Sequence, residues 1–224
     1  MSIQEQLKTI LGEIDVLDDF TVHAREAEER AGKLAVHVAE QDKALGCPKW
    51  WTAASFDAAR WPAAAQVLAG DEKRNILFAA PTNCGKSHAA CALARLDAAA
   101  GKTLYRLREH SFYPLWDQSR YRESEGFKDA VTRAKRADVL VYDDLGKVEI
   151  VRGNGFALTP FGCVLFDIFD ERAERRLRNI VTTRYPGWKE LESVVGGDFL
   201  RRVLQIEAND KSRGHIVTMC NGQA

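Results

Sequence analysis

The chain has 224 residues, of which 29% are charged and 46% hydrophobic. That length can bury one substantial core and leaves room for a small accessory segment. Lysine plus arginine equals aspartate plus glutamate, 32 each, which excludes a global field drawing the protein onto nucleic acid or an anionic membrane. Any contact with nucleic acid must therefore be local.

The cysteines are odd in number, scattered and without a CxxC pair: Cys47, Cys84, Cys91, Cys163 and Cys220. This pattern argues against a disulfide framework and against a zinc module, and it fits a reducing cytoplasm. The N-terminus has acids where a signal peptide needs an apolar run, and no stretch approaches transmembrane length. We expect a soluble, cytoplasmic protein with no membrane partner.

Residues 2–45 are rich in Glu, Ala, Lys and Leu and contain no proline, which predicts helix. An apolar stripe at spacings of three and four comprises Ile3, Leu7, Ile10, Leu11, Ile14 and Leu17. Glutamates four residues before basic side chains then indicate a solvated helix. Residues 1–46 allow two interpretations: a helical hairpin packed on the main domain, or a docking arm for a partner.

Gly46 and Pro48 break the helical pattern, and residues 47–70 form a linker. The linker is rich in aromatic residues, namely Trp50, Trp51, Phe56 and Trp61. We expect it to pack on the domain that follows, residues 71–224.

Strands alternate with helices from residue 75 onward. The expected strands are 75–79, 103–107, 138–142, 179–183 and 214–219, and the expected helices are 87–100, 161–177 and 199–204. A mixed helical stretch separates the second and third strands. This alternation predicts an α/β fold of three layers, with a central parallel sheet covered by helices on both faces.

A phosphate-binding loop is predicted between the first strand and the first helix, where the sequence reads APTNCGKS from Ala80 to Ser87. Backbone N–H groups of such a loop curl around phosphates, the lysine reaches the β- and γ-phosphates, and the Ser87 hydroxyl binds Mg²⁺. Ala80 and Asn83 replace glycines of the usual pattern, but asparagine tolerates left-handed backbone angles. We expect ATP to be held by Ala80, Pro81, Thr82, Asn83, Cys84, Gly85, Lys86, Ser87 and His88.

The strand at 138–142 ends in two aspartates, as a P-loop ATPase requires at a neighbouring strand tip. Asp143 is expected to support Mg²⁺. Asp144 is expected to orient or deprotonate the attacking water.

With these two sites placed, the sequence resembles the DnaC/IstB branch of the AAA+ ATPases, which comprises helicase loaders and transposition helper ATPases. The resemblance runs from about Pro48 to the C-terminus. Its carriers are CPKWW at 47–51 with Ser55-Phe56, the phosphate loop, VYDDLGK at 141–147, LFDIFDER at 165–172 and NIVTTR at 179–184.

The resemblance implies further roles. Thr182 and Thr183 fall at the tip of the sensor-one strand, which hydrogen-bonds the γ-phosphate or its water, whereas Arg184 stands where a small polar residue is usual. Arg202, with Arg201 as the fallback, would be an arginine finger acting across a subunit boundary, so the resemblance implies self-association. It also implies little or no C-terminal lid.

Two segments combine groups suited to single-stranded DNA. One interleaves arginines with aromatics at 106–113, followed by Trp116, Arg120, Tyr121 and Arg122. The other contains Arg172, Arg175, Arg176 and Arg178. Buried aromatics and ordinary solvated arginines are the competing interpretation of both.

The leading functional hypothesis is an Mg²⁺-dependent ATPase that loads a replicative helicase onto single-stranded DNA and docks that helicase through its N-terminal helices. The same core would serve a transposition helper ATPase. A small-molecule kinase is disfavoured by the Asp143-Asp144 pair and the sensor-like threonines, and a regulatory GTPase by the absence of an NKxD motif. The substituted phosphate loop leaves a non-hydrolysing scaffold open.

Overall fold

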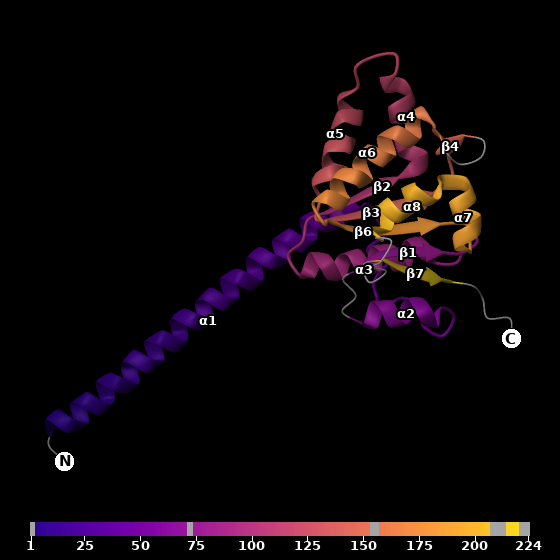
Figure 1. Ribbon diagram of the computed structural model, residues 1–224. Helices are drawn as coiled ribbons and strands as arrows, with labels where there is room; N and C mark the ends of the chain where they lie inside the picture. The colour runs from indigo at the N-terminus through magenta and orange to yellow at the C-terminus, as the bar shows by residue number, and fades with distance from the viewer. Residues whose placement is uncertain (1–2, 71–73, 153–156, 207–213, 220–224) are drawn as a thin grey trace. The chain divides into compact units, whose positions relative to one another are not determined.

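The computed structural model describes residues 3–70, 74–152, 157–206 and 214–219, with side chains from residue 24 onward (Figure 1). The chain divides into two compact units, Met1–Glu40 and Gln41–Ala224, which are described separately below. The expectation of little or no C-terminal lid concerns the segment after Met219. That segment lies outside the described residues.

The first unit is one continuous helix. Helix α1 runs from Ile3 to Leu45, and its last turn belongs to the second unit. Of the two interpretations of residues 1–46, the hairpin is therefore wrong, as is the plural in the expected N-terminal helices, because neither Gly12 nor Gly32 ends the helix. The pairs Arg30–Glu26 at 3.4 Å and Lys33–Glu29 at 2.8 Å are solvent-exposed, as the i,i+4 pattern predicted.

The second unit is built on a five-stranded sheet. Its strands are β1 (Asn75–Ala79), β2 (Leu104–Arg108), β3 (Val139–Leu145), β6 (Arg178–Thr183) and β7 (Gly214–Thr218). Their order is β2-β3-β6-β1-β7, and every neighbouring pair is parallel. The apolar runs that predicted strands are buried on both faces in β1, β3 and β6. The predicted three-layer α/β fold is confirmed.

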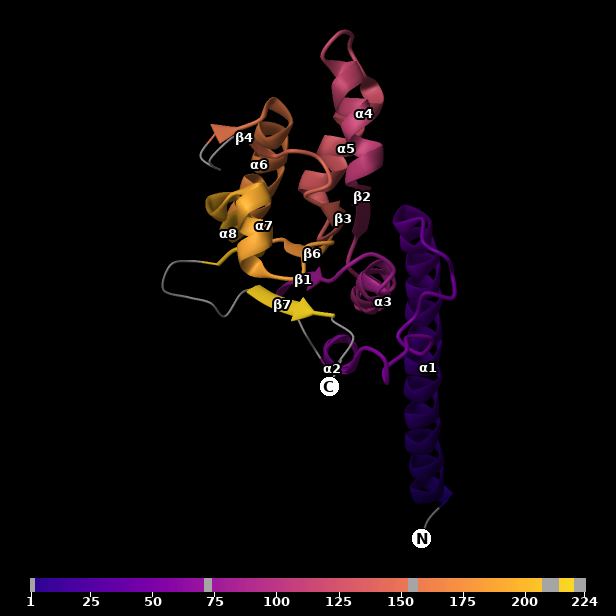
Figure 2. The same cartoon turned by 90° about the vertical axis from the view of Figure 1, so that its right-hand side faces the viewer.

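Helices cover both faces of the sheet (Figure 2). On one face, α2 (Pro62–Ala69) and α3 (Lys86–Ala99) pack on Ile76, Phe78 and Val141. The other face carries α4 (Glu109–Ser119), α5 (Glu125–Arg136), α6 (Pro160–Glu174), α7 (Trp188–Val195) and α8 (Gly197–Leu204). A small antiparallel pair, β4 (Val151–Arg152) and β5 (Ala157–Leu158), precedes α6.

A disulfide joins Cys47 to Cys91 of α3. The expectation of unpaired cysteines is wrong for these two, because the fold brings together residues 44 positions apart in the sequence. Arg95 of α3 reinforces the same junction, since its Nε pairs with Asp42 at 2.7 Å and its Nη2 donates to the Pro48 carbonyl at 3.1 Å. Residues 47–51 are therefore tied to α3 by both covalent and polar contacts.

Across the described ranges, no helix combines the length and the apolar composition needed to cross a membrane.

Candidate nucleotide-binding site

The phosphate loop links the end of β1 to the start of α3 through two residues with left-handed backbone angles. Asn83 has φ 63° and Gly85 has φ 73°, so the expectation that asparagine adopts this conformation is confirmed. Ala80 is fully buried, and its N–H donates to the Thr183 carbonyl at 3.2 Å. A small side chain is therefore what this position requires.

Lys86, at the first position of α3, is almost fully buried. Its Nζ donates to the Pro81 carbonyl at 2.6 Å, which holds the ammonium over the loop. Burial lowers the pKa of Lys86, while Cys84, Asp144 and Asp143 oppose that effect. The lysine thus lies inside the loop that it is expected to serve.

Asp143 is the centre of a hydrogen-bonded cluster at the tip of β3. Its Oδ1 accepts from the Ser87 hydroxyl at 2.8 Å and from the Thr182 hydroxyl at 2.6 Å. Its Oδ2 forms an ion pair with Arg106 on β2, and both side chains are buried. Burial alone would raise the pKa of Asp143, but Arg106, Thr182 and Ser87 together hold it below its usual range.

Sheet topology explains why these residues meet. Strand β6 lies between β1 and β3, so the carboxyl ends of all three strands fall side by side. The phosphate loop, Thr182 and Asp143 each follow or end one of these strands. The structure therefore brings together Ser87 and Asp143, which the sequence singled out as the metal-binding pair.

Asp144 and Thr183 take different positions from their neighbours. Asp144 has φ 71°, is half-buried, and its N–H donates to the Thr182 hydroxyl at 2.9 Å. Thr183 is fully buried, and its hydroxyl donates to the Leu145 carbonyl at 2.9 Å. Of the two sensor threonines, Thr182 is the one in contact with Asp143.

The His88 side chain turns toward residues 50–56 rather than toward the loop. Its ring stacks on Trp51 with centroids 5.8 Å apart, and its Nε2 lies 3.1 Å from the Ser55 hydroxyl. Only the backbone of His88 is thus left to bind a phosphate.

Arg201 and Arg202 lie on α8 with their side chains about half exposed. Arg202 Nε pairs with Asp170 at 2.9 Å, and Arg201 pairs with Asp198 at 2.8 Å. Arg184 is also exposed, and its guanidinium stacks on Tyr185. In the part of the chain that the structure describes, no recorded contact joins Arg201 or Arg202 to the phosphate loop.

The structure removes several residues from the predicted DNA-binding segments. Arg106 is bound to Asp143, and the rings of Phe112 and Trp116 belong to the core. Arg172 is fully buried and donates to the Ala134 and Ala137 carbonyls, among others. Burial, together with the charge of Arg175, lowers the pKa of Arg172 to about 9. The prediction that Arg106 and Arg172 are surface cations is therefore wrong, as is the prediction that Phe112 and Trp116 are exposed stacking rings.

Glu109 is a buried acid beside the site that the sequence did not single out. It accepts hydrogen bonds from Tyr142, Gly146 and Val148, which flank the two aspartates. Burial raises the pKa of Glu109 to about 7, although these hydrogen bonds oppose the effect. A glutamate within an arginine-rich segment carries no sequence signal of burial.

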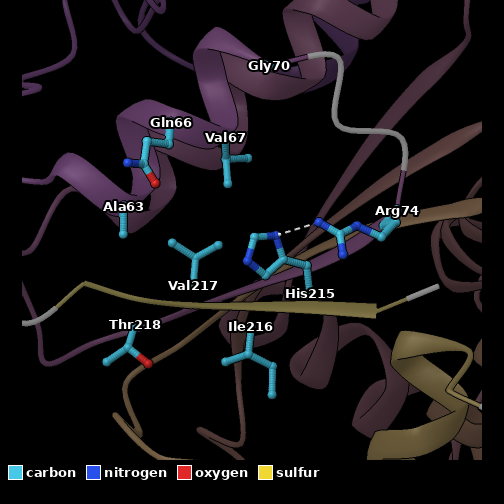
Figure 3. Close-up of a pocket in the computed structure, with 9 residues that line it drawn as sticks. All are labelled: Ala63, Gln66, Val67, Gly70, Arg74, His215, Ile216, Val217 and Thr218. Atoms are coloured by element: carbon cyan, nitrogen blue, oxygen red, sulfur yellow. Dashed lines mark hydrogen bonds between the residues drawn. The ribbon is translucent and has the colours of Figure 1, made fainter. Parts of the chain in front are cut away.

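A separate hollow of about 450 Å³ lies between α2 and the edge strand β7 (Figure 3). Arg74 and His215 form a hydrogen bond of 3.2 Å on one side of it, and Val67 and Val217 contribute apolar walls. None of the residues expected to hold ATP lines this hollow.

Comparison with known families identifies the chain. The model of the family described as "IstB-like ATP binding protein" matches residues 23–204, which is most of the sequence. The chain belongs to the family of IstB-like ATP binding proteins. No curated protein matches it.

Solved structures similar to this IstB-like protein include replication proteins. AMPPCP-bound DnaA from Aquifex aeolicus has a TM-score of 0.53 at 15% identity, covering 70% of this chain and 48% of that one. Domain III of the Thermotoga maritima replication initiation protein DnaA has a TM-score of 0.51 at 13% identity, covering 70% of this chain and 64% of that one. DnaI has a TM-score of 0.51 at 15% identity, covering 78% of this chain and 93% of that one.

These likenesses support the three-layer α/β fold with its central parallel sheet. The IstB-like chain spans about half the length of the Aquifex aeolicus DnaA chain.

The residues present suit Mg²⁺ together with a nucleotide. The described residues contain no cluster of three or more His, Cys, Asp and Glu side chains able to hold a metal unaided. A hydroxyl and a carboxylate 2.8 Å apart, from Ser87 and Asp143, are hard oxygen ligands beside a phosphate loop. Mg²⁺ is commonly bound through one or two such groups plus phosphates and water.

Proposed function

We propose that this IstB-like protein hydrolyses ATP and uses the cycle to load a replicative helicase onto single-stranded DNA. The observation that carries the hydrolytic part is the Ser87–Asp143–Thr182 cluster next to the buried Lys86. It supplies a metal-binding hydroxyl and carboxylate beside the phosphate loop. Mg²⁺ held there would neutralise charge on the transferring phosphoryl group.

Asp144 is the group proposed to act on the attacking water. Water oxygen forms a bond to the γ-phosphorus, the bond from that phosphorus to the β–γ bridging oxygen breaks, and the water proton passes to the Asp144 carboxylate. ADP and inorganic phosphate are the products. Asp144 has a left-handed backbone conformation and its N–H donates to Thr182, whereas the Asp143 carboxylate accepts from Thr182; this difference supports the division of roles.

Phosphate release tests the ATPase. Lys86→Ala should abolish it, and Asp144→Asn should reduce it by about 10²–10⁴-fold, the usual contribution of general acid–base catalysis, while ATP binding persists. Lys189→Ala, which removes an exposed lysine of α7, is the matched control. Wild-type protein that binds ATP without releasing phosphate would instead be the non-hydrolysing scaffold.

Helix α1 supports the loader part of the proposal. It is a single helix of 43 residues whose side chains at 24–36 are exposed, and its first half carries the apolar stripe read from the sequence. Deleting residues 1–20 should abolish binding to the replicative helicase and spare ATP binding. Retained helicase binding would contradict the docking role. If a transposase is bound in place of the helicase, the protein is a transposition helper.

The turn between α4 and α5 is the proposed contact to single-stranded DNA. Tyr121 is 79% exposed, and the Arg120 guanidinium lies 5.6 Å from its ring centroid. An exposed ring beside a cation suits stacking on an unpaired base and contact with a phosphate. Tyr121→Ala should weaken binding to a single-stranded oligonucleotide several-fold. The cytoplasm is the proposed location of this activity.

A further inference from the structure

Glu109 is the first residue of α4 and follows β2 directly. In the parallel register of the sheet, the preceding residue, Arg108, lies opposite Asp143. The Glu109 side chain therefore starts next to the tip of β3. It is fully buried, and in the described part of the chain no basic side chain forms an ion pair with it.

Three donors surround this carboxylate. Tyr142 donates its hydroxyl to Oε2 at 2.9 Å, the Gly146 N–H donates to Oε2 at 3.2 Å, and the Val148 N–H donates to Oε1 at 2.5 Å. Tyr142 immediately precedes the aspartate pair, and Gly146 and Val148 follow it within four residues. Glu109 thus holds both sides of the Asp143-Asp144 segment.

The segment held by Glu109 is a tight turn. Gly146 has φ 84°, and a Cβ placed there would come within 3.0 Å of the Tyr185 ring. The Lys147 N–H donates to the Asp144 carbonyl at 3.2 Å, and the Tyr185 hydroxyl donates to the Gly146 carbonyl at 3.3 Å. The backbone of Asp144 is part of this turn, so its position depends on the groups that anchor the turn.

We propose that Glu109 is a positioning residue for ATP hydrolysis, which fixes the 144–148 turn and so aims the Asp144 carboxylate at the attacking water. This inference rests on the proposed ATPase activity. Glu109 touches neither of the aspartate side chains and acts through the backbone. Its loss should therefore impair the chemical step more than nucleotide binding.

A glutamine substitution tests the hydrogen bonds that the two carboxylate oxygens of Glu109 accept. Each oxygen accepts a backbone N–H, one from Gly146 and one from Val148. A glutamine has the same shape but only one acceptor oxygen, and in either orientation its NH₂ group faces a backbone N–H. Glu109→Gln consequently breaks one side of the anchor without emptying the site.

The experiment compares wild type, Glu109→Gln and Asp97→Asn. Asp97, near the C-terminal end of α3, is a matched control, because it is also a buried carboxylate but pairs with Arg178 and Lys102. Steady-state phosphate release should show kcat lowered about 10–100-fold in Glu109→Gln, the loss typical of a misplaced group, with KM changed less than about threefold. Asp97→Asn should keep kcat within about twofold of wild type.

Hydrogen exchange of the nucleotide-free protein provides a readout independent of hydrolysis. Peptides covering 144–148 should exchange faster in Glu109→Gln and remain unchanged in Asp97→Asn. An unchanged kcat, or unchanged exchange at 144–148, would overturn the inference. Absence of phosphate release from wild type would overturn the ATPase proposal instead, and exchange would then decide whether Glu109 anchors the turn. If Glu109→Gln fails to fold, Tyr142→Phe removes one donor and should lower kcat several-fold.

Discussion

Several buried charged side chains of this protein have specific partners, and Arg106 and Glu109 near the phosphate loop are two examples. Arg106 reaches Asp143 from β2, its Nη1 donates to the Cys47 sulfur at 3.3 Å, and its Nε is buried without a partner in the structure. Glu109 satisfies its charge through three neutral donors instead. Both arrangements are costly to disturb, because a buried charge that loses its partner keeps its desolvation penalty.

Arg106→Met should therefore be strongly destabilising. The substitution leaves Asp143 buried without its cation, for which a loss of about 3–5 kcal/mol in the free energy of unfolding is typical. Chemical denaturation checks this, with Arg60→Met as the control, since Arg60 is exposed and its guanidinium stacks on Trp61. A loss below about 1 kcal/mol would show that the ion pair contributes little.

Glu109 should give the protein a distinctive pH dependence. Its folded-state pKa of about 7 lies above the ordinary value of 4.5. Between these values the folded state retains a proton that the unfolded state has lost, so the free energy of unfolding decreases as pH rises. The contribution is about 3 kcal/mol, at 1.36 kcal/mol per pH unit. Denaturation at pH 5 and pH 8 should show this decrease in wild type and not in Glu109→Gln; parallel profiles would contradict it.

Elements with a clear pattern of apolar residues could be predicted from the sequence, and elements whose order depends on tertiary contacts could not. Strands β1, β3 and β6 are buried on both faces, so they read as continuous apolar runs. Helix α7 and the β4–β5 pair are short and gain their order from packing on α6 and α8. Ser87 and Asp143, which the sequence predicts as a metal-binding pair, lie in contact. The burial of Arg106, Glu109 and Arg172 follows only from the fold.

The link between residues 47–51 and α3 should depend on redox state. In the unfolded chain the Cys47–Cys91 disulfide closes a loop with a sequence separation of 44, and such cross-links contribute about 2–4 kcal/mol. Cys91→Ser should lower the free energy of unfolding by that amount without reductant and have a much smaller effect with dithiothreitol. Cys163→Ser, which removes an exposed free thiol, is the control. Equal stability of wild type with and without reductant would show that the disulfide does not form.

At the scale of the whole molecule, the described residues place neither arginine of α8 in contact with the phosphate loop of its own chain. Lys86, Ser87, Asp143 and Asp144 gather at one edge of the sheet, whereas α8 directs Arg202 to solvent beside Asp170. A cation that neutralises the transferring phosphoryl group is expected to accelerate such reactions by about 10³–10⁵-fold. We propose that Arg202 supplies it to the site of a neighbouring copy, which would make turnover depend on self-association.

Mixing two inactive variants tests this arrangement. Lys86→Ala lacks a working phosphate loop but retains Arg202, and Arg202→Ala has the opposite defect. If the finger acts across the interface, an interface of mixed composition joins the intact loop of one subunit to the intact arginine of the other. Phosphate release should then reappear in the mixture, up to about a quarter of the wild-type rate for randomly mixed pairs. The same mixture made with Arg201→Ala in place of the Arg202→Ala variant distinguishes the two arginines. Only the variant that lacks the finger is inactive alone and restored by mixing with Lys86→Ala. Activity of Arg202→Ala alone at the wild-type rate would remove Arg202 from the mechanism.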